Sequence, residues 1–495
     1  MCVVANAAAL AVLAAYFFFV PGVLVVRDVR DPALSRDAVP RAAWRLFHFL
    51  TPRYERWAGT RIASGRAADR PVTDISGTEW PVFGSMFYLW SVESLQAAWE
   101  KDPSVAPVEP RAYARGAVEA AKDLIIDPAS AGWVRTYWGD DYLSREDVFY
   151  RMLVIGALTT HHRLTGETRH LAMLRGQVES LAAELDASPT GQLDDYPGQC
   201  YTTDVVAAIA MIRRADAVLG TDHSAFVARE RRGFEGKCLD TLGLVPFQSD
   251  SRTGETVDAG RGSSNSYLCV FAPELWPDKG KTWYDIYGRN FWQGRWGAAG
   301  FREFAQRGRG GDWYLDVDSG PVVAGFGVSA CAFGVGASRA NGRFDHARPL
   351  AQEMVAASWP LPGGTLLLPR MLSNATDAPL VGEAAILFVL TRRPTVQASV
   401  EATAAGTPGV VYALAAGYFA AAAVLVFWAA VRVRGLRRLR TGPPPAMGVQ
   451  FVLWLVLGLG GAWTAASGST LAGLVMLLVA LLLPVDRRRV QKKGA

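Results

Sequence analysis

One pattern recurs through the middle of the chain, from about residue 74 to residue 395. An apolar helical stretch ends at a glycine-containing turn, and a second, amphipathic stretch begins a few residues later. The clearest turn glycines are Gly166, Gly220, Gly280 and Gly342, so successive copies lie 54, 60 and 62 residues apart. Glycine closes a helix well because it readily adopts a left-handed conformation. A nearly constant period of this length indicates an array of helical hairpins.

Six copies of the hairpin fit this region. An earlier copy fits Trp80 to Trp99, and a last one fits Gly382 to Thr391. Six such hairpins predict an all-α, (α/α)6 toroid in which six inner helices line a cavity; an open solenoid is the alternative. The first stretch of each pair is the more apolar, and residues 322–337 carry no charge. A helix that is apolar on all sides is buried, so the first helices are expected to form the inner ring.

The N-terminal residues 1–26 are uncharged and almost wholly apolar. Roughly 20 such residues suffice to cross a bilayer. The stretch lacks the basic start and the small-residue cleavage site of a secretory signal. We therefore predict a retained transmembrane anchor, with a cleaved signal as the alternative.

The C-terminal part predicts three further membrane crossings. Residues 409–431 form one span, a basic loop follows at 432–448, a transmembrane hairpin occupies 449–484, and a basic tail covers 485–495. Basic loops stay in the cytoplasm, so a multi-pass protein of the cell membrane is expected, with its middle domain outside. Four arginines directly after the first span favour the opposite orientation: Arg27, Arg30, Arg36 and Arg41.

The remaining chain divides into a juxtamembrane segment at 27–73 and the helical domain at 74–400. Aromatic residues around 44–57 predict that the segment lies near the membrane interface. The net charge is +5, but the basic residues crowd beside the spans, which argues against a nucleic-acid partner. Five scattered cysteines show no zinc spacing, so a metal site is not expected. The lipid bilayer is a predicted partner, and an oligomer is possible.

The starts of the six inner helices should meet at one mouth of the toroid, because the helices run parallel. Counting back about 20 residues from each turn places polar residues at these starts. Carboxylates and tyrosines on converging helix ends are suited to acid/base chemistry on a small or sugar-like substrate. The catalytic candidates are Asp318, Asp316, Asp194, Asp195, Cys200, Glu79 and Tyr196. The substrate-binding candidates are Trp138, Asp140, Tyr142, Tyr150, Asn265 and Trp313.

Each candidate also has a plain structural interpretation. Asp318 could cap a helix, whereas Asp316 is harder to explain in this way. Asp194 and Asp195 could be solvated loop charges, Cys200 a small buried hydrophobe, and Glu79 a charge that complements a helix dipole. Three histidines near a hairpin turn are expected at the surface, away from the mouth: His161, His162 and His170. The sequence contains no HExxH, GxSxG or phosphate-binding loop.

Several short motifs resemble the linalool dehydratase/isomerase family. They are Arg135-Thr-Tyr-Trp-Gly-Asp140, Glu146-Asp-Val-Phe-Tyr150, Asp194-Asp-Tyr196 with Gln199-Cys200, and Asp316-Val-Asp-Ser-Gly320. The resemblance covers roughly residues 75–360. It implies an (α/α)6 fold, an extracytoplasmic location and cofactor-free lyase or isomerase chemistry on a terpene alcohol.

The resemblance carries over only in part. Cys200 corresponds to the second of two active-site cysteines in the family. Gly191, Gln192 and Leu153 occupy the positions of the first cysteine, its neighbouring acid and a histidine. We therefore expect the same fold with a different substrate.

Two other classes of function fit the same sequence. One is a cell-envelope glycan hydrolase or epimerase, in which Trp138, Trp313, Tyr314 and Tyr196 stack on sugar rings. The other is a non-catalytic envelope binding or assembly protein. A mouth lined by aromatic residues favours a glycan, a closed apolar pocket favours a terpenoid, and acids too far apart to share a substrate favour the binding protein.

Overall fold

The computed structural model describes residues 2–305, 312–374, 376–396 and 406–439, with residues 456–458, 460, 461, 473, 476 and 480. These residues are mostly helical, which confirms the predicted helical class. They divide into two compact units. One contains the described residues of 1–26, 359–362 and 413–495, and the other, the helical unit, contains those of 27–358 and 363–412.

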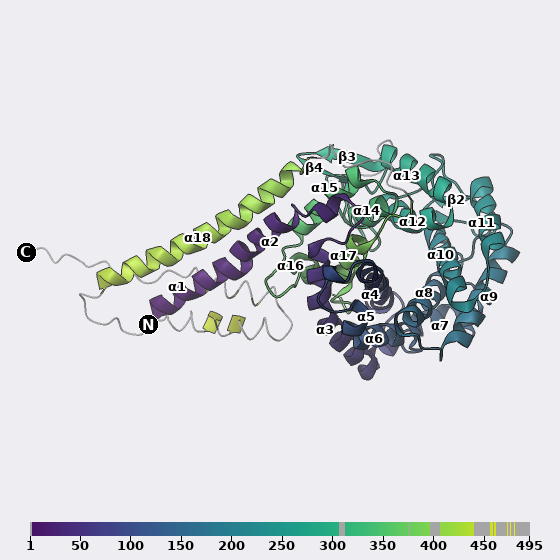
Figure 1. Cartoon of the computed structure of the whole chain (residues 1–495), viewed down its shortest axis with the longest axis horizontal. Coiled ribbons are helices and arrows are strands. Elements are labelled where there is room, and N and C mark those ends of the chain that lie inside the picture. Colours follow the sequence, from purple (N-terminus) through teal and green to yellow (C-terminus); the bar gives the residue numbers. More distant parts are fainter. Residues whose placement is uncertain are drawn as a thin grey trace, which may run out of the picture. The chain divides into compact units, whose positions relative to one another are not determined.

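Six helices of the helical unit pack against one another in a closed circuit. Each contacts the next in chain order, and the last contacts the first (Figure 1). They are α4 (Ile75–Lys101), α8 (Val148–Thr165), α10 (Thr202–Leu219), α12 (Gly262–Leu275), α14 (Val328–Ala340) and α17 (Val381–Thr391). The side chains of these helices are largely buried, as expected for apolar helices with neighbours on every side.

Six further helices pack on the outside of this circuit (Figure 1). They are α3 (Arg41–Ser64), α6 (Arg115–Ile126), α9 (Leu171–Ala187), α11 (Ser224–Lys237), α13 (Pro277–Phe291) and α15 (Phe344–Ala357). Helix α3 contacts α17, so an N-terminal outer helix covers the last inner helix of the chain. Three short helices lie between these elements: α5 (Pro110–Tyr113), α7 (Gly132–Trp138) and α16 (Leu367–Ser373).

Three small antiparallel sheets connect the helices. They pair β1 (Gln248–Ser249) with β2 (Thr256–Asp258), β3 (Trp292–Arg295) with β4 (Ala298–Phe301), and β5 (Trp313–Asp316) with β6 (Gly320–Val323), which also pairs with β7 (Phe326–Gly327). Single 3₁₀ turns occur at Pro32–Ser35, Arg66–Asp69, Pro103–Val105 and Tyr142–Ser144.

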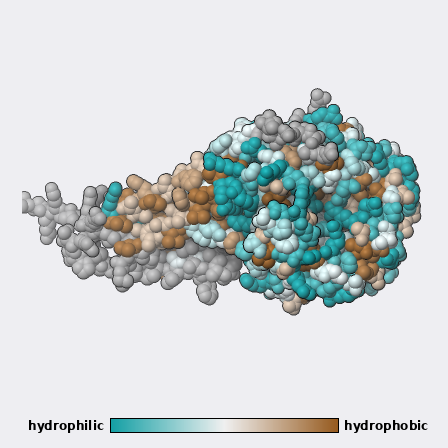
Figure 2. Space-filling view, in the orientation of Figure 1, coloured by the Kyte–Doolittle hydropathy of each residue, from teal (hydrophilic) through white to brown (hydrophobic). Residues whose placement is uncertain are grey.

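The unit with the described residues of 1–26, 359–362 and 413–495 contains most of two long apolar helical stretches. Helices α1 (Cys2–Leu13) and α2 (Val20–Asp28) are joined by a π-helical segment at Ala14–Phe19, and α18 covers Gly409–Leu439. Residues 6–28 and 409–434 are long and apolar enough to cross a membrane. Hydrophobic residues gather over these helices in Figure 2. The predicted basic loop beyond residue 439, the hairpin at 449–484 and the tail at 485–495 lie almost wholly outside the described residues.

One of the predicted hairpin turns differs in the structure. Gly166 and Gly220 adopt left-handed conformations, with φ of 75° and 66°, and end α8 and α10 as expected. Gly280 instead lies inside α13, where a Cβ would approach the Pro273 nitrogen to 2.6 Å, so it allows α12 and α13 to pack closely. The preceding turn is made at Trp276 and Pro277, since proline begins a helix well.

The predicted inner helix at residues 322–337 also begins later than expected. Residues 320–327 form β6 and β7, joined at Ala324 and Gly325, which both have positive φ. The helix α14 therefore starts at Val328. As a consequence, Asp318 lies in the turn between β5 and β6 and not at a helix start.

The predicted juxtamembrane segment is part of the helical unit. Helix α3 buries Leu46, Leu50 and Tyr54, and the Tyr54 ring stacks on Tyr88 of α4 with centroids 4.3 Å apart. The aromatic residues that suggested a membrane interface thus serve the packing of an outer helix.

Candidate functional site

Five carboxyl groups from five different segments form what we call the acid cluster. They belong to Glu79 of α4, Asp147 at the start of α8, Asp195 before α10, Asp204 in the first turn of α10, and Asp318 between β5 and β6. Each interacts with at least one other member, because the charge of one group of the pair raises the pKa of the other. Like charges that share a site oppose ionisation, and protonated carboxyls become available as acids.

Glu79 lies beside a tyrosine in this cluster. The Tyr196 hydroxyl donates a short hydrogen bond to Oε1 of Glu79. Burial raises the pKa of Glu79 to about 7, the Tyr196 bond opposes the rise, and the charge of Asp318 adds to it. A carboxyl group that titrates near neutrality can both donate and accept a proton at the pH of a cell.

The pKa values of the two aspartates around the start of α10 are also raised. Burial raises the pKa of Asp204, and the charges of Asp318 and Glu79 raise it further. Burial likewise raises the pKa of Asp195, followed by the charge of Asp204, although Oδ2 of Asp195 accepts a 2.7 Å bond from the Tyr201 amide. Both shifts favour the protonated form of the carboxyl group.

Asp147 occupies an unusual backbone position for an aspartate. Its φ is 41°, and its side chain accepts a bond from the Tyr150 amide at the start of α8. Burial raises the pKa of this carboxyl, and Oδ2 has no hydrogen-bond partner among the described residues. Strained, underpartnered polar groups are concentrated at functional sites.

Asp316 and Asp318 have different roles in the β5–β6 turn. Oδ1 of Asp316 accepts bonds from the amides of Asp318 (3.1 Å) and Ser319 (2.6 Å), and Oδ2 accepts a 2.8 Å bond from Arg261. Although burial alone would raise the pKa of Asp316, the Ser319 bonds and the Arg261 charge lower it. Asp316 therefore fixes the turn, a capping role that the sequence had suggested for Asp318.

The side chain of Asp318 is exposed to solvent, although many protein atoms lie around its carboxyl group. These surroundings raise the pKa of the Asp318 carboxyl, and the charge of Asp316 adds to the effect. Asp318 is thus the member of the acid cluster that a substrate can reach most easily from solution.

Aromatic rings surround the acid cluster. The Tyr196 ring contacts those of Trp133, Tyr137 and Tyr201 at centroid distances of 5.9, 5.3 and 6.4 Å. Farther along the inner helices, Tyr267 of α12 lies 5.7 Å from Phe83. Its hydroxyl is buried and has no partner in the described chain. Aromatic faces bind apolar molecules, sugar rings and developing positive charge.

Two more of the predicted catalytic residues serve the surrounding framework. Oδ2 of Asp194 accepts a 2.6 Å bond from the Gly198 amide and so holds its own loop. Cys200 is fully buried, and its thiol lies 3.5 Å from Oε1 of Gln192. Burial raises the pKa of this thiol, which keeps it in the less reactive protonated form.

The predicted substrate-binding residues lie at scattered positions. Trp138 donates to the Asp195 carbonyl at 3.3 Å, Tyr150 donates to the Ile125 carbonyl at 2.7 Å, and Asn265 donates to the Val245 carbonyl at 3.2 Å. The ring of Tyr142 packs on Tyr150 at 5.9 Å. Of these residues, Trp138 and Asn265 anchor loops beside the acid cluster.

Two of the predicted binding residues point to solvent. Asp140 forms a 2.6 Å ion pair with Arg135 in which the aspartate side chain is 88% exposed. Trp313 of β5 is 71% exposed. Neither contacts a member of the acid cluster.

Four residues of this site are not among the predicted ones: Asp147, Tyr201, Asp204 and Tyr267. The first three lie at or near the starts of inner helices, where polar residues were expected. The signal for Asp204 was its place in the first turn of an apolar helix. Charged residues in such helices need a specific reason to be there.

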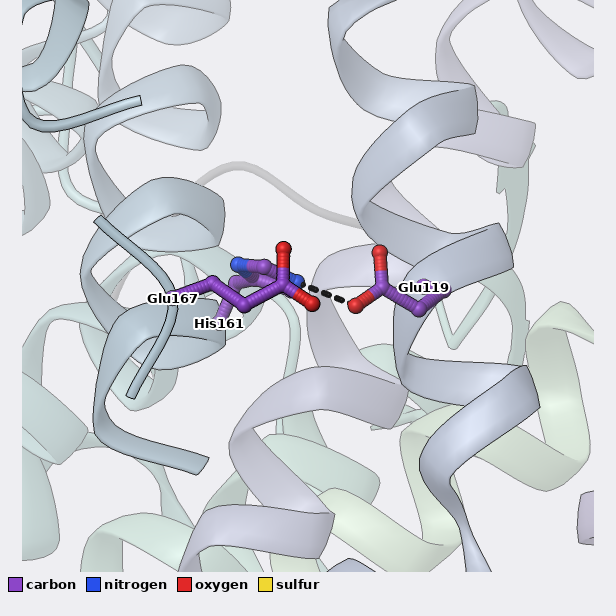
Figure 3. A group of neighbouring side chains, drawn as sticks. All are labelled: Glu119, His161 and Glu167. Carbon is purple, nitrogen blue, oxygen red and sulfur yellow. Dashed lines mark hydrogen bonds and ion pairs between the residues drawn. The ribbon is translucent and has the colours of Figure 1, made fainter. Parts of the chain in front are cut away.

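A second group of titratable side chains lies between α6 and α8 (Figure 3). The ligand atoms of Glu119, His161 and Glu167 lie within 4.8 Å of one another. Glu119, however, already binds His161 at 2.8 Å, Arg169 at 3.0 Å and Lys122 at 3.3 Å. Two cations compete with any metal ion for the same oxygens, so we interpret the group as an ion-pair network. His161 is buried, and its prediction as a surface residue was wrong.

The chain matches no protein-family model, and no curated protein matches it.

Proposed function

We propose that the protein is a membrane-anchored enzyme of the linalool dehydratase/isomerase type, built on an (α/α)6 toroid. It would carry out cofactor-free lyase or isomerase chemistry on a hydroxyl-bearing small molecule. The closed circuit of inner helices supports the toroid. The observation that carries the proposal is Glu79, hydrogen-bonded to Tyr196 with a pKa of about 7, beside Asp204 and Asp318.

The proposed reaction is the acid/base elimination of water. Protonated Glu79 donates its proton to the hydroxyl oxygen of the substrate, and the carbon–oxygen bond breaks to release water. Asp318, in its ionised form, removes a proton from the neighbouring carbon, whose bonding electrons form the double bond. Positive charge develops on carbon in between, and the carboxylates and the rings of Tyr196 and Tyr201 stabilise it. Return of the proton from Asp318 to Glu79 completes the cycle.

A glycan hydrolase or epimerase is the second candidate. The rings of Trp133, Tyr137, Tyr196 and Tyr201 near the acid cluster favour it, because sugar rings stack on aromatic faces. Glycosidases also use a pair of carboxyls and develop positive charge on carbon. The two candidates therefore differ in substrate and not in the groups that act.

The location proposed for the helical unit is outside the cytoplasm. Residues 409–434 are long and apolar enough to cross a membrane, and the basic residues Arg432 and Arg434 lie at the end of this stretch. A reporter enzyme that is active only in the periplasm, fused after Pro408, is expected to be active. A silent reporter would reverse the orientation.

An untargeted metabolite screen tests the proposed activity. Purified wild-type protein and Asp318→Asn are each incubated with a cell-envelope extract, and we expect a substrate and product pair to change with wild-type protein alone. Glu230→Gln is the matched control, because burial raises the pKa of Glu230 to about 8 and its charged neighbours, Asp186 and Arg229, lie outside the acid cluster. A glycan product selects the second candidate. Equal conversion by Asp318→Asn would remove this residue from the mechanism, and no conversion by any form would favour a binding protein.

A further inference from the structure

The hairpin formed by β3 and β4 has a bulky residue at a strained position. Arg295 pairs with Ala298, which leaves a two-residue loop of Trp296 and Gly297. Both have positive φ, of 54° and 76°. Asparagine, aspartate or glycine suits the first position of such a loop, whereas a tryptophan there costs stability. The strain suggests that the indole serves a purpose at the hairpin tip.

The indole of Trp296 projects into solvent. It is 74% exposed, more than any other large hydrophobic side chain that the structure describes. The guanidinium of Arg295 lies 4.2 Å from the centre of its ring and also pairs with Asp312 at 2.6 Å. A tryptophan beside an arginine is typical of side chains at the headgroup level of a bilayer.

The hairpin tip contacts the first turn of the apolar helix α18. The Val410 amide donates a 3.1 Å bond to the Gly297 carbonyl, and a Cβ on Gly297 would lie 3.5 Å from the Cα of Gly409. Gly409 is the first residue of the segment that is long and apolar enough to cross a membrane. The end of a membrane span lies at the bilayer surface, so a residue in contact with that end lies there too.

A crevice of about 490 Å³ lies beside the same tip. Its lining includes Trp292, Ala298, His346 and Pro349, together with Pro408 and Gly409 at the start of α18. The His346 ring stacks on Trp292 at 4.1 Å, and burial lowers the pKa of His346 to about 4, so the imidazole is neutral. Asp345 also lines the crevice, and its carboxylate pairs with Arg343 at 2.8 Å. A crevice with both polar and apolar walls suits the glycerol region and upper acyl chain of a phospholipid.

We propose that the tip of the β3–β4 hairpin binds the membrane surface. The Trp296 indole enters the headgroup region of the leaflet in which α18 begins, and the neighbouring crevice holds part of a phospholipid. This contact would fix the height and tilt of the helical unit above the bilayer. The inference rests on the membrane-anchoring part of the proposed function and is independent of its catalytic part.

Photocrosslinking in lipid nanodiscs tests this contact with the full-length protein. Benzoylphenylalanine replaces one residue at a time at Trp296, at Trp313 or at Val424, and phospholipid adducts are quantified by mass spectrometry. Trp313 is the matched control, because it is 71% exposed and also lies on a β-hairpin. Val424 lies within the apolar part of α18 and reports whether this helix is in the bilayer.

We expect phospholipid adducts at positions 296 and 424, and several-fold fewer at 313. Adducts at 424 without an excess at 296 over 313 would overturn the hairpin contact and leave the anchor intact. Absence of adducts at both 424 and 296 would overturn the anchor and the hairpin contact together. The catalytic proposal would be untouched by either result.

Discussion

Replacing Glu383 by alanine is expected to lower the free energy of unfolding by roughly 3–5 kcal/mol, the range for breaking a buried ion pair. The Glu383 side chain is fully buried in α17. It accepts a short bond from Arg370, a 3.4 Å bond from Arg53 of α3 and a 3.0 Å bond from the Leu366 amide. The substitution leaves two largely buried arginines without their carboxylate partner. Arg53 belongs to α3, the outer helix that covers the last inner helix, α17. The lost ion pairs therefore lie where the circuit of inner helices closes.

Denaturant unfolding of the purified protein in detergent measures this effect. Glu235→Ala is the control, since Glu235 also binds two cations, Arg231 at 3.1 Å and Lys279 at 3.4 Å, but lies at the surface. We expect that substitution to change the unfolding free energy by less than about 1 kcal/mol. Similar small losses for both variants would show that Glu383 does not close the circuit.

Loss of the Glu79 carboxyl is expected to reduce turnover about 10²–10⁴-fold, the usual contribution of a general acid or base. Glu79→Gln keeps the shape of the side chain and can still accept the Tyr196 hydrogen bond, but it cannot transfer a proton. Tyr196→Phe should have a smaller effect on the rate. It removes a bond that lowers the pKa of Glu79, so that pKa rises and the pH optimum moves upward.

Steady-state kinetics on the substrate found by the screen check both variants, with Glu230→Gln again as the control. Glu79→Gln should lower kcat with little change in KM, because the proton transfer belongs to the reaction step. Equal kcat values for wild type and Glu79→Gln would remove Glu79 from the proposed mechanism.

The sequence predicted the helical class well because its signals are local. Gly166 and Gly220 sit just past apolar helices and end them with left-handed conformations. The sequence could not show which glycines serve another purpose. Gly280 lies within a helix and is needed because two helices pack closely there, which depends on tertiary contacts.

Position in the chain was a poor guide to position in the fold for two segments. Helix α3 follows an apolar N-terminal stretch, so its aromatic residues suggested a membrane surface. Tyr54 instead stacks on Tyr88 of α4, and α3 packs on α6 and α17. The apolar residues from 322 onward were assigned to a helix, but residues 322–327 belong to β6, to the turn at Ala324 and Gly325, and to β7. Helix and strand periodicity are hard to tell apart in a short apolar run.

The acid cluster could be predicted in outline from the starts of the inner helices. Glu79, Asp195 and Asp318 were named, whereas Asp147 and Asp204 were not. Asp316 and Asp318 were both predicted to be catalytic, and only the three-dimensional turn shows that Asp316 accepts the bond from the Ser319 amide. Hydrogen bonds of this kind depend on small rotations of the backbone, which cannot be inferred from amino-acid composition.

The central claim is that carboxyl groups from distant segments meet and raise one another's pKa. Isotope-edited infrared titration of the carboxyl groups tests it without a substrate, in wild-type protein and in Asp318→Asn. Removing the Asp318 charge makes ionisation of Glu79 and Asp204 easier, so both should titrate at lower pH in the variant. We predict a carboxyl group with a pKa near 7 in wild type, assigned to Glu79 by its loss in Glu79→Gln, that moves downward in Asp318→Asn. A Glu79 carboxyl that titrates near its ordinary value of 4.5 in both proteins would contradict the account.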